Sequence, residues 1–135
     1  MQYLTSCAVV VDDDKDSADT VAMVLELGGV DVRVAYSASD GLALVRRHHP
    51  GAVVTDLDMP RMSGIEEARA LRSMPEGRHV CLIALTGSGH LESNARAAGF
   101  DHFLLKPGNI EELTALVTQA CDRSSPSTAQ ADFDR

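Results

Sequence analysis

Short apolar runs rich in β-branched residues alternate along this chain with longer stretches in which apolar residues recur at helical spacing. An apolar run without polar alternation is typical of a strand buried on both faces of a sheet. The predicted strands span residues 7–11, 32–36, 52–56, 80–85 and 102–105. Strict alternation of strands and helices implies right-handed crossovers and a parallel sheet. The sequence therefore predicts an α/β fold with a parallel five-stranded sheet.

Residues that cap or break helices set the expected helix boundaries. The first helix is expected from about Ser17, with Asp16 or Ser17 as its cap and Gly28 at its end. Ser39 and Asp40 open the second, which stops before Pro50. The other three are expected from about Gly64, over residues 91–98 up to Gly99, and from Gly108 or Asn109 onward.

Composition and charge exclude several classes of protein. The sequence predicts one domain over residues 1–122 and a disordered tail over 123–135, which is rich in Ser, Thr, Asp and Pro. A net charge of −8 disfavours a nucleic-acid binder, which needs a basic face. We expect no membrane association and a cytoplasmic location, because no apolar run is long enough to span a bilayer and no signal peptide is evident. The widely spaced Cys7, Cys81 and Cys121 are typical of a reducing compartment.

Polar residues follow four of the predicted strands at the point where each strand ends. They are the acidic triplet 12–14, Asp56, Thr86 and Lys106. The carboxyl ends of parallel strands lie on one edge of the sheet, and open α/β sheets bind ligands there. These residues, far apart in the sequence, should therefore converge on one pocket.

The chemistry of this pocket is indicated by its charges. Aspartates that gather at close range raise one another's pKa or recruit a cation. Oxygen ligands without metal-spaced Cys or His favour a hard divalent ion, most plausibly Mg²⁺. The acids are Asp12, Asp13, Asp14, Asp56 and Asp58. With the positive charge of Lys106 and the hydroxyl of Thr86, they describe a phosphoryl-transfer site in which Asp56 forms an acyl phosphate.

Four short motifs lie at the ends of predicted strands: Val-Val-Val-Asp-Asp-Asp (9–14), Thr-Asp-Leu-Asp-Met-Pro-Arg-Met-Ser-Gly (55–64), Ala-Leu-Thr-Gly (84–87) and Leu-Leu-Lys-Pro (104–107). They resemble those of the receiver domain of two-component response regulators, over about residues 7–121. Each alone is weak, but together, in order and each at a strand end, they are specific. The resemblance implies a flavodoxin-like sheet of order 2-1-3-4-5 with helices on both faces.

The resemblance also implies a role for each acid. Asp56 would accept the phosphoryl group from a phosphohistidine of a partner sensor kinase or phosphotransfer protein. Asp13 and Asp56 would bind Mg²⁺ directly, Asp12 would bind it through water, and Asp58 through its backbone carbonyl. Lys106 would contact a phosphoryl oxygen, and its peptide bond to the next proline is expected to be cis.

A switch is implied by the same resemblance. Thr86 would move toward the phosphoryl group, and Phe103 would swing inward behind it. The surface over residues 87–121 would then meet an unknown output protein or a second copy of the chain. We expect signalling through protein contacts, with no enzymatic turnover beyond slow self-dephosphorylation.

Two other functions stay open. Asp56-Leu57-Asp58 matches the Asp-x-Asp core of haloacid-dehalogenase-type phosphatases, but Met59-Pro60 follows it and the motif lies on the third predicted strand instead of the first. A receiver that only docks, without phosphorylation, is the other alternative. The full set of site residues argues against it.

Overall fold

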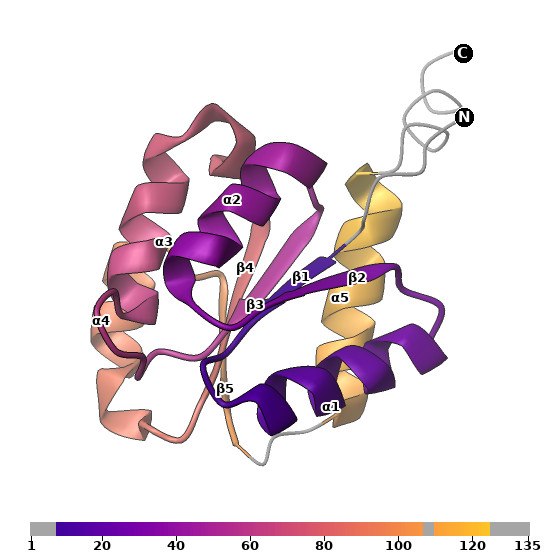
Figure 1. Ribbon diagram of the computed structural model, residues 1–135, viewed down its shortest axis with the longest axis horizontal. Helices are drawn as coiled ribbons and strands as arrows, with labels where there is room; N and C mark the ends of the chain where they lie inside the picture. The colour runs from indigo at the N-terminus through magenta and orange to yellow at the C-terminus, as the bar shows by residue number, and fades with distance from the viewer. Residues whose placement is uncertain (1–7, 107–109, 125–135) are drawn as a thin grey trace.

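The strands lie side by side in the predicted parallel arrangement. A computed structural model describes residues 8–106 and 110–124 of the chain. They contain a five-stranded sheet of order β2-β1-β3-β4-β5, which confirms the flavodoxin-like order (Figure 1). The strands are β1 (Ala8–Val11), β2 (Val32–Ala35), β3 (Ala52–Thr55), β4 (Cys81–Thr86) and β5 (His102–Leu105).

Helices cover both faces of the sheet, and each face has its own hydrophobic core (Figure 1). α2 (Ala38–His48), α3 (Gly64–Ser73) and α4 (Glu92–Ala98) pack on one face. α1 (Lys15–Leu27) and α5 (Ile110–Ser124) pack on the other. Alternate residues of the buried strands point into opposite cores, so Val9 and Val11 contribute to the first and Val10 to the second. Short 3₁₀ turns, Pro75–Gly77 and Gly89–Leu91, precede β4 and α4.

Two helices begin earlier than the sequence predicted. α1 starts at Lys15 and is capped by Asp14, whose carboxylate accepts from the backbone N–H of Ser17; the expected caps Asp16 and Ser17 lie inside the helix. α2 starts at Ala38 behind the cap Ser37, before the predicted Ser39. The cap is the residue that keeps an extended backbone, and in each case it is a short polar residue upstream of those predicted.

The end of the chain is described only in part. α5 ends at Ser124, so its last residues fall within the segment 123–135 that the sequence assigned to a tail. Residues 125–135, the predicted strand residue Cys7, the predicted cis peptide at Pro107 and the proposed caps Gly108 and Asn109 lie outside the described residues. Among the residues that are described, no helix has both the length and the apolar character that crossing a membrane requires.

The N-terminus of α3 contacts the backbone that follows β3. Ser63 and Glu66 form a capping box, in which each side chain accepts from the other residue's backbone N–H. The next residue, Gly64, lies so close to that backbone that a Cβ atom there would be 2.2 Å from the carbonyl oxygen of Asp56. Only a residue without a side chain fits this contact, so Gly64 sets how closely α3 approaches Asp56.

Replacing Gly64 with alanine should therefore destabilise the fold. Alanine favours helix over glycine by up to about 1 kcal/mol, but the clash with the Asp56 carbonyl forces a backbone shift, and we expect a net loss of about 1–3 kcal/mol in the free energy of unfolding. Urea unfolding measures it. Gly87→Ala is the matched control, because a Cβ at Gly87 meets no atom within 4 Å. Equal stability of the two variants would contradict the contact.

Candidate functional site

The ends of β1, β3 and β4 lie together at one edge of the sheet. Val11 pairs in register with Thr55, so Asp12 and Asp56 leave adjacent strands at the same level. The backbone N–H of Asp56 donates to the carbonyl of Val11 at 3.0 Å, which keeps the two chain segments in contact one residue beyond β3. The backbone N–H of Lys106 likewise donates to the carbonyl of Thr86 at 2.8 Å. The predicted convergence of the four strand ends is confirmed.

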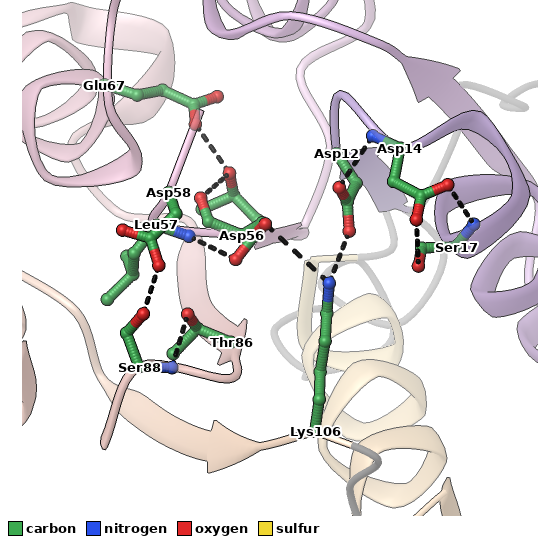
Figure 2. Close-up of polar contacts among 11 residues, drawn as sticks. Asp12, Asp14, Ser17, Asp56, Leu57, Asp58, Glu67, Thr86, Ser88 and Lys106 are labelled. Atoms are coloured by element: carbon green, nitrogen blue, oxygen red, sulfur yellow. Dashed lines mark hydrogen bonds and ion pairs between the residues drawn. The ribbon is translucent and has the colours of Figure 1, made fainter. Parts of the chain in front are cut away.

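Lys106 joins the two acidic strand ends. Its Nζ lies 2.8 Å from Oδ2 of Asp12 and 3.7 Å from Oδ2 of Asp56. Figure 2 shows the lysine side chain extending from β5 to a point between the two carboxylates. The carboxylate side chains are only 7% and 12% exposed, so their negative charge is poorly solvated. The ammonium group offsets part of this charge at close range.

The pKa values of Asp56 and Lys106 are both shifted upward. Burial raises the pKa of Asp56, and the nearby charge of Asp12 adds to that rise, while the charge of Lys106 and hydrogen bonds from the Leu57 backbone and Thr86 act against it. Burial would lower the pKa of Lys106, but its bond to Asp12 and the charges of Asp56, Asp12 and Asp14 raise it overall. Lys106 is therefore a fixed cation at neutral pH.

Three carboxylates fit a divalent cation. Asp12, Asp13 and Asp56 each offer an oxygen, and these oxygens lie within 4.8 Å of one another. Hard oxygen ligands close together suit Mg²⁺. The side chain of Asp13 is exposed, whereas that of Asp14, the other acid of the triplet, caps α1. Of the predicted acids, Asp58 directs its side chain elsewhere: it accepts a hydrogen bond from the Ser88 hydroxyl (Figure 2).

The two predicted switch residues lie on neighbouring strands. Thr86, the last residue of β4, is fully buried, and its Oγ1 accepts a hydrogen bond of 3.2 Å from the backbone N–H of Ser88. Phe103 pairs in register with Ala84 and is partly buried against the core under α2, α3 and α4. The structure thus places Thr86 beside Asp56 and Phe103 on the next strand.

Glu67 is a buried acid that sequence reasoning missed. It lies on α3, is 0% exposed, and its Oε1 accepts a hydrogen bond of 2.7 Å from the hydroxyl of Thr55, the residue before Asp56. Burial raises its pKa from 4.5 to about 8, against the smaller lowering effect of the Thr55 bond. The signal was present in the sequence: residues 64, 67, 68 and 71 have the i, i+3, i+4, i+7 spacing of a buried helix face, which puts this glutamate inside.

Comparison with known proteins identifies the family. Residues 8–118 match the response regulator receiver domain. The chain belongs to this family. It is 39% identical over 124 residues to a Leptolyngbya boryana chain described as an uncharacterized 14.6 kDa protein in the sodA1 3′ region, with 90% of this chain and 95% of that one covered. It is 34% identical to the transcriptional regulatory protein PrrA of Mycobacterium tuberculosis, over 93% of this chain but 54% of PrrA.

Solved receiver structures share the architecture. A putative response regulator from Chloroflexus aurantiacus superimposes with a TM-score of 0.80 at 26% identity, covering 89% of this chain and all of that one (100%). The structure titled FixJ-N superimposes with a TM-score of 0.77 at 30% identity, over 90% and 96% of the two chains. This receiver chain spans about half the length of the mycobacterial regulators that it matches.

Membership of the receiver family shows which of the predicted classes of function this chain belongs to. Receiver domains are phospho-acceptor switches of two-component signalling, they generally bind Mg²⁺ at an acidic pocket, and they interact with histidine kinases or phosphotransfer proteins. The family acts in signalling and is not a family of classical enzymes. These comparisons do not support the phosphatase alternative.

Removing one carboxylate of the acidic cluster should weaken Mg²⁺ binding. Mg²⁺ that binds only the folded protein raises the midpoint of thermal unfolding. In Asp13→Ala, one oxygen ligand is lost, and we expect the apparent Mg²⁺ affinity to fall roughly tenfold or more. Thermal unfolding at a series of Mg²⁺ concentrations measures it.

Asp14→Ala is the matched control for that titration. It removes the same charge from the adjacent residue but costs only the cap of α1, about 1 kcal/mol of stability, so its Mg²⁺-dependent shift should match that of the wild type. Equal Mg²⁺ responses in the Asp13 variant and the wild type would contradict the site.

Proposed function

We propose that Asp56 is the residue that accepts the phosphoryl group. The observation that carries this proposal is the position of Lys106, whose ammonium group lies between the buried carboxylates of Asp12 and Asp56. A carboxylate oxygen of Asp56 attacks the phosphorus of a partner's phosphohistidine, the P–N bond breaks, and the imidazole nitrogen takes its electron pair and then a proton. Lys106 provides positive charge to the phosphoryl oxygens as they arrive.

Asp13 and Asp56 are proposed to bind Mg²⁺ directly, with Asp12 binding it through water and Asp58 through its backbone carbonyl. When bound, the ion supplies charge neutralisation to the phosphoryl oxygens. The proximity of the three carboxylate oxygens supports the first three assignments. The turned-away side chain of Asp58 is compatible with the fourth, since only the backbone of Asp58 is needed.

Thr86 and Phe103 are proposed to convey the change at Asp56 to the surface over residues 87–121. Thr86, whose hydroxyl oxygen accepts from the Ser88 backbone N–H, would turn its O–H to donate to the phosphoryl group, and Phe103, now only partly buried, would move inward behind it. That surface would meet an output protein or a second copy of the chain. We place this switch in the cytoplasm, where its phosphohistidine donor would act, with a receiver that includes all of α5 and so extends past the predicted boundary at residue 122.

The proposed switch is not an enzyme beyond slow loss of its own phosphoryl group. A receiver that only docks would not need Asp12, Asp13, Asp56, Thr86 and Lys106 together at one edge of the sheet. The arrangement favours a domain that is phosphorylated once per signal over an enzyme that hydrolyses many phosphoester molecules.

The proposal is tested by phosphorylation with acetyl phosphate and Mg²⁺. Intact-mass spectrometry should show one added phosphoryl group per wild-type chain and none on Asp56→Asn, because the amide is not a nucleophile. Asp58→Asn is the matched control: it changes a neighbouring acid whose side chain is not proposed to take part, so it should still be modified.

An equal adduct on Asp56→Asn and the wild type would refute Asp56 as the acceptor. Multiple turnover of a phosphoester substrate, with Asp56 required, would instead favour the phosphatase.

A further inference from the structure

Among the described residues, the carboxyl group of Glu67 has a hydrogen-bonding partner on only one of its oxygens. Oε1 is bonded to the Thr55 hydroxyl, while no described residue offers a hydrogen-bond partner to the buried Oε2. Oε2 lies against α2 at Gly41, where a built Cβ would be 2.8 Å from it and 2.7 Å from Cγ2 of Val11. An ionised carboxylate in this position would leave a charged oxygen against carbon atoms, which is costly.

The hydroxyl of Thr55 is shared between two acceptors. Its Oγ1 lies 2.7 Å from Oε1 of Glu67 and 3.0 Å from the backbone carbonyl oxygen of Asp56. A threonine hydroxyl has a single proton, so it cannot donate to both oxygens at once. Both contacts can be hydrogen bonds only if Glu67 brings a proton of its own and donates to Oγ1, which leaves the threonine proton for Asp56.

We propose that Glu67 is a proton-carrying positioning residue for the phospho-acceptor. As a neutral acid it donates to Thr55, and Thr55 then donates to the carbonyl of Asp56. When Glu67 loses its proton, the Thr55 hydroxyl turns to the carboxylate and the Asp56 carbonyl loses this hydrogen bond. The effect on phosphorylation rests on the proposed role of Asp56, whereas the hydrogen bonds themselves do not.

The described surroundings of Glu67 favour the neutral form, because burial is the main influence on its carboxyl and no charged group acts on it. The groups near its carboxyl in the described part of the chain are the Thr55 hydroxyl from β3 and Gly41 from α2, with the Val11 side chain of β1 next to Gly41, and none of these is titratable. The charged residues beside it on α3, Glu66 and Arg69, point to solvent. The pKa of about 8 that burial gives Glu67 agrees with a proton held at neutral pH and lost in mildly alkaline solution.

The same carbonyl oxygen is also approached closely by α3. Gly64 approaches it so closely that only a bare Cα fits, and Glu67 lies one helical turn further along α3 (Figure 2 shows Glu67 reaching toward the end of β3). The carbonyl is thus fixed by sterics from Gly64 and by a hydrogen bond from Thr55. Loss of the hydrogen bond would allow the peptide after Asp56 to rotate and its carboxylate to move with it.

The test follows the carbonyl carbon of Asp56 and the rate of phosphorylation across about pH 6 to 10. In the wild type we expect the ¹³C shift of the Asp56 carbonyl to change with a midpoint near 8, the pKa of Glu67. The rate of phosphorylation by acetyl phosphate with Mg²⁺ should fall about threefold to tenfold over the same range, the effect of one hydrogen bond. In Glu67→Gln, whose amide can donate at every pH, both changes should be absent.

Three further variants make the test specific. Glu26→Gln makes the same substitution at an exposed site on α1 and should keep both pH-dependent changes. Thr55→Ser keeps the hydroxyl and should keep them too, whereas Thr55→Val should lose them, which decides the matter if Glu67→Gln does not fold. A carbonyl shift that does not titrate in the wild type, or that titrates equally in Glu67→Gln, would overturn the inference.

The two proposals can fail separately. If the wild type forms no phosphoryl adduct while the carbonyl shift titrates as described, the acceptor role of Asp56 fails and the hydrogen-bond relay stands. If the adduct forms but its rate has the same alkaline decrease in Glu67→Gln, the acceptor stands and the positioning role of Glu67 is wrong.

Discussion

The contact of Lys106 with Asp12 and Asp56 holds the functional edge of this receiver together. Without it, two largely buried carboxylates would lie close together beside the exposed Asp13, with no other ion pair among the described residues to offset their charge. Buried like charges are expensive, and a partner ammonium at hydrogen-bonding distance is one of the few groups that can offset them. The parallel direction of the strands matters because it brings the end of β5, which Lys106 follows, to the same edge as the ends of β1 and β3.

The second support of the site comes from α3, on the opposite side of Asp56 from Lys106. Gly64 and Glu67 both act on the backbone carbonyl of Asp56, the first by close approach and the second through Thr55. The side chain of Asp56 is therefore restrained by charge and its backbone by packing. A nucleophile fixed in this way needs little reorganisation when a phosphoryl donor arrives.

The sheet and the composition of the site could be predicted because they depend on strong local patterns. Continuous β-branched runs such as Val9–Val11 mark strands buried on both faces, and the alternating run at 32–36 marked the edge strand β2. Polar residues at strand ends then had to meet at one edge. Lys106 and Asp12 are 94 residues apart, so no local sequence pattern indicates their contact. The contact follows from the sheet topology.

The helix starts and the role of Glu67 could not be predicted in the same way. Three identical aspartates precede α1, and which of them caps it depends on the backbone angles of each, since Asp12 turns to Lys106 and Asp14 to the helix. Glu67 could be placed on a buried face by its spacing, but its partner Thr55 and its unpartnered oxygen depend on how α3 docks on β3. The roles of Asp58, Thr86 and Phe103 in signalling stay predictions.

The most direct test of the central interaction is a double-mutant cycle between Lys106 and Asp12. The free energy of unfolding in urea, without Mg²⁺, would be measured for the wild type, Lys106→Met, Asp12→Asn and the double variant. Because the contact is at 2.8 Å and Asp12 is nearly buried, we predict a coupling energy of about 1 kcal/mol or more, with the double variant less destabilised than the sum of the single ones. Effects that add to within about 0.3 kcal/mol would show that the two groups do not interact in the folded protein, and would contradict this account of the site.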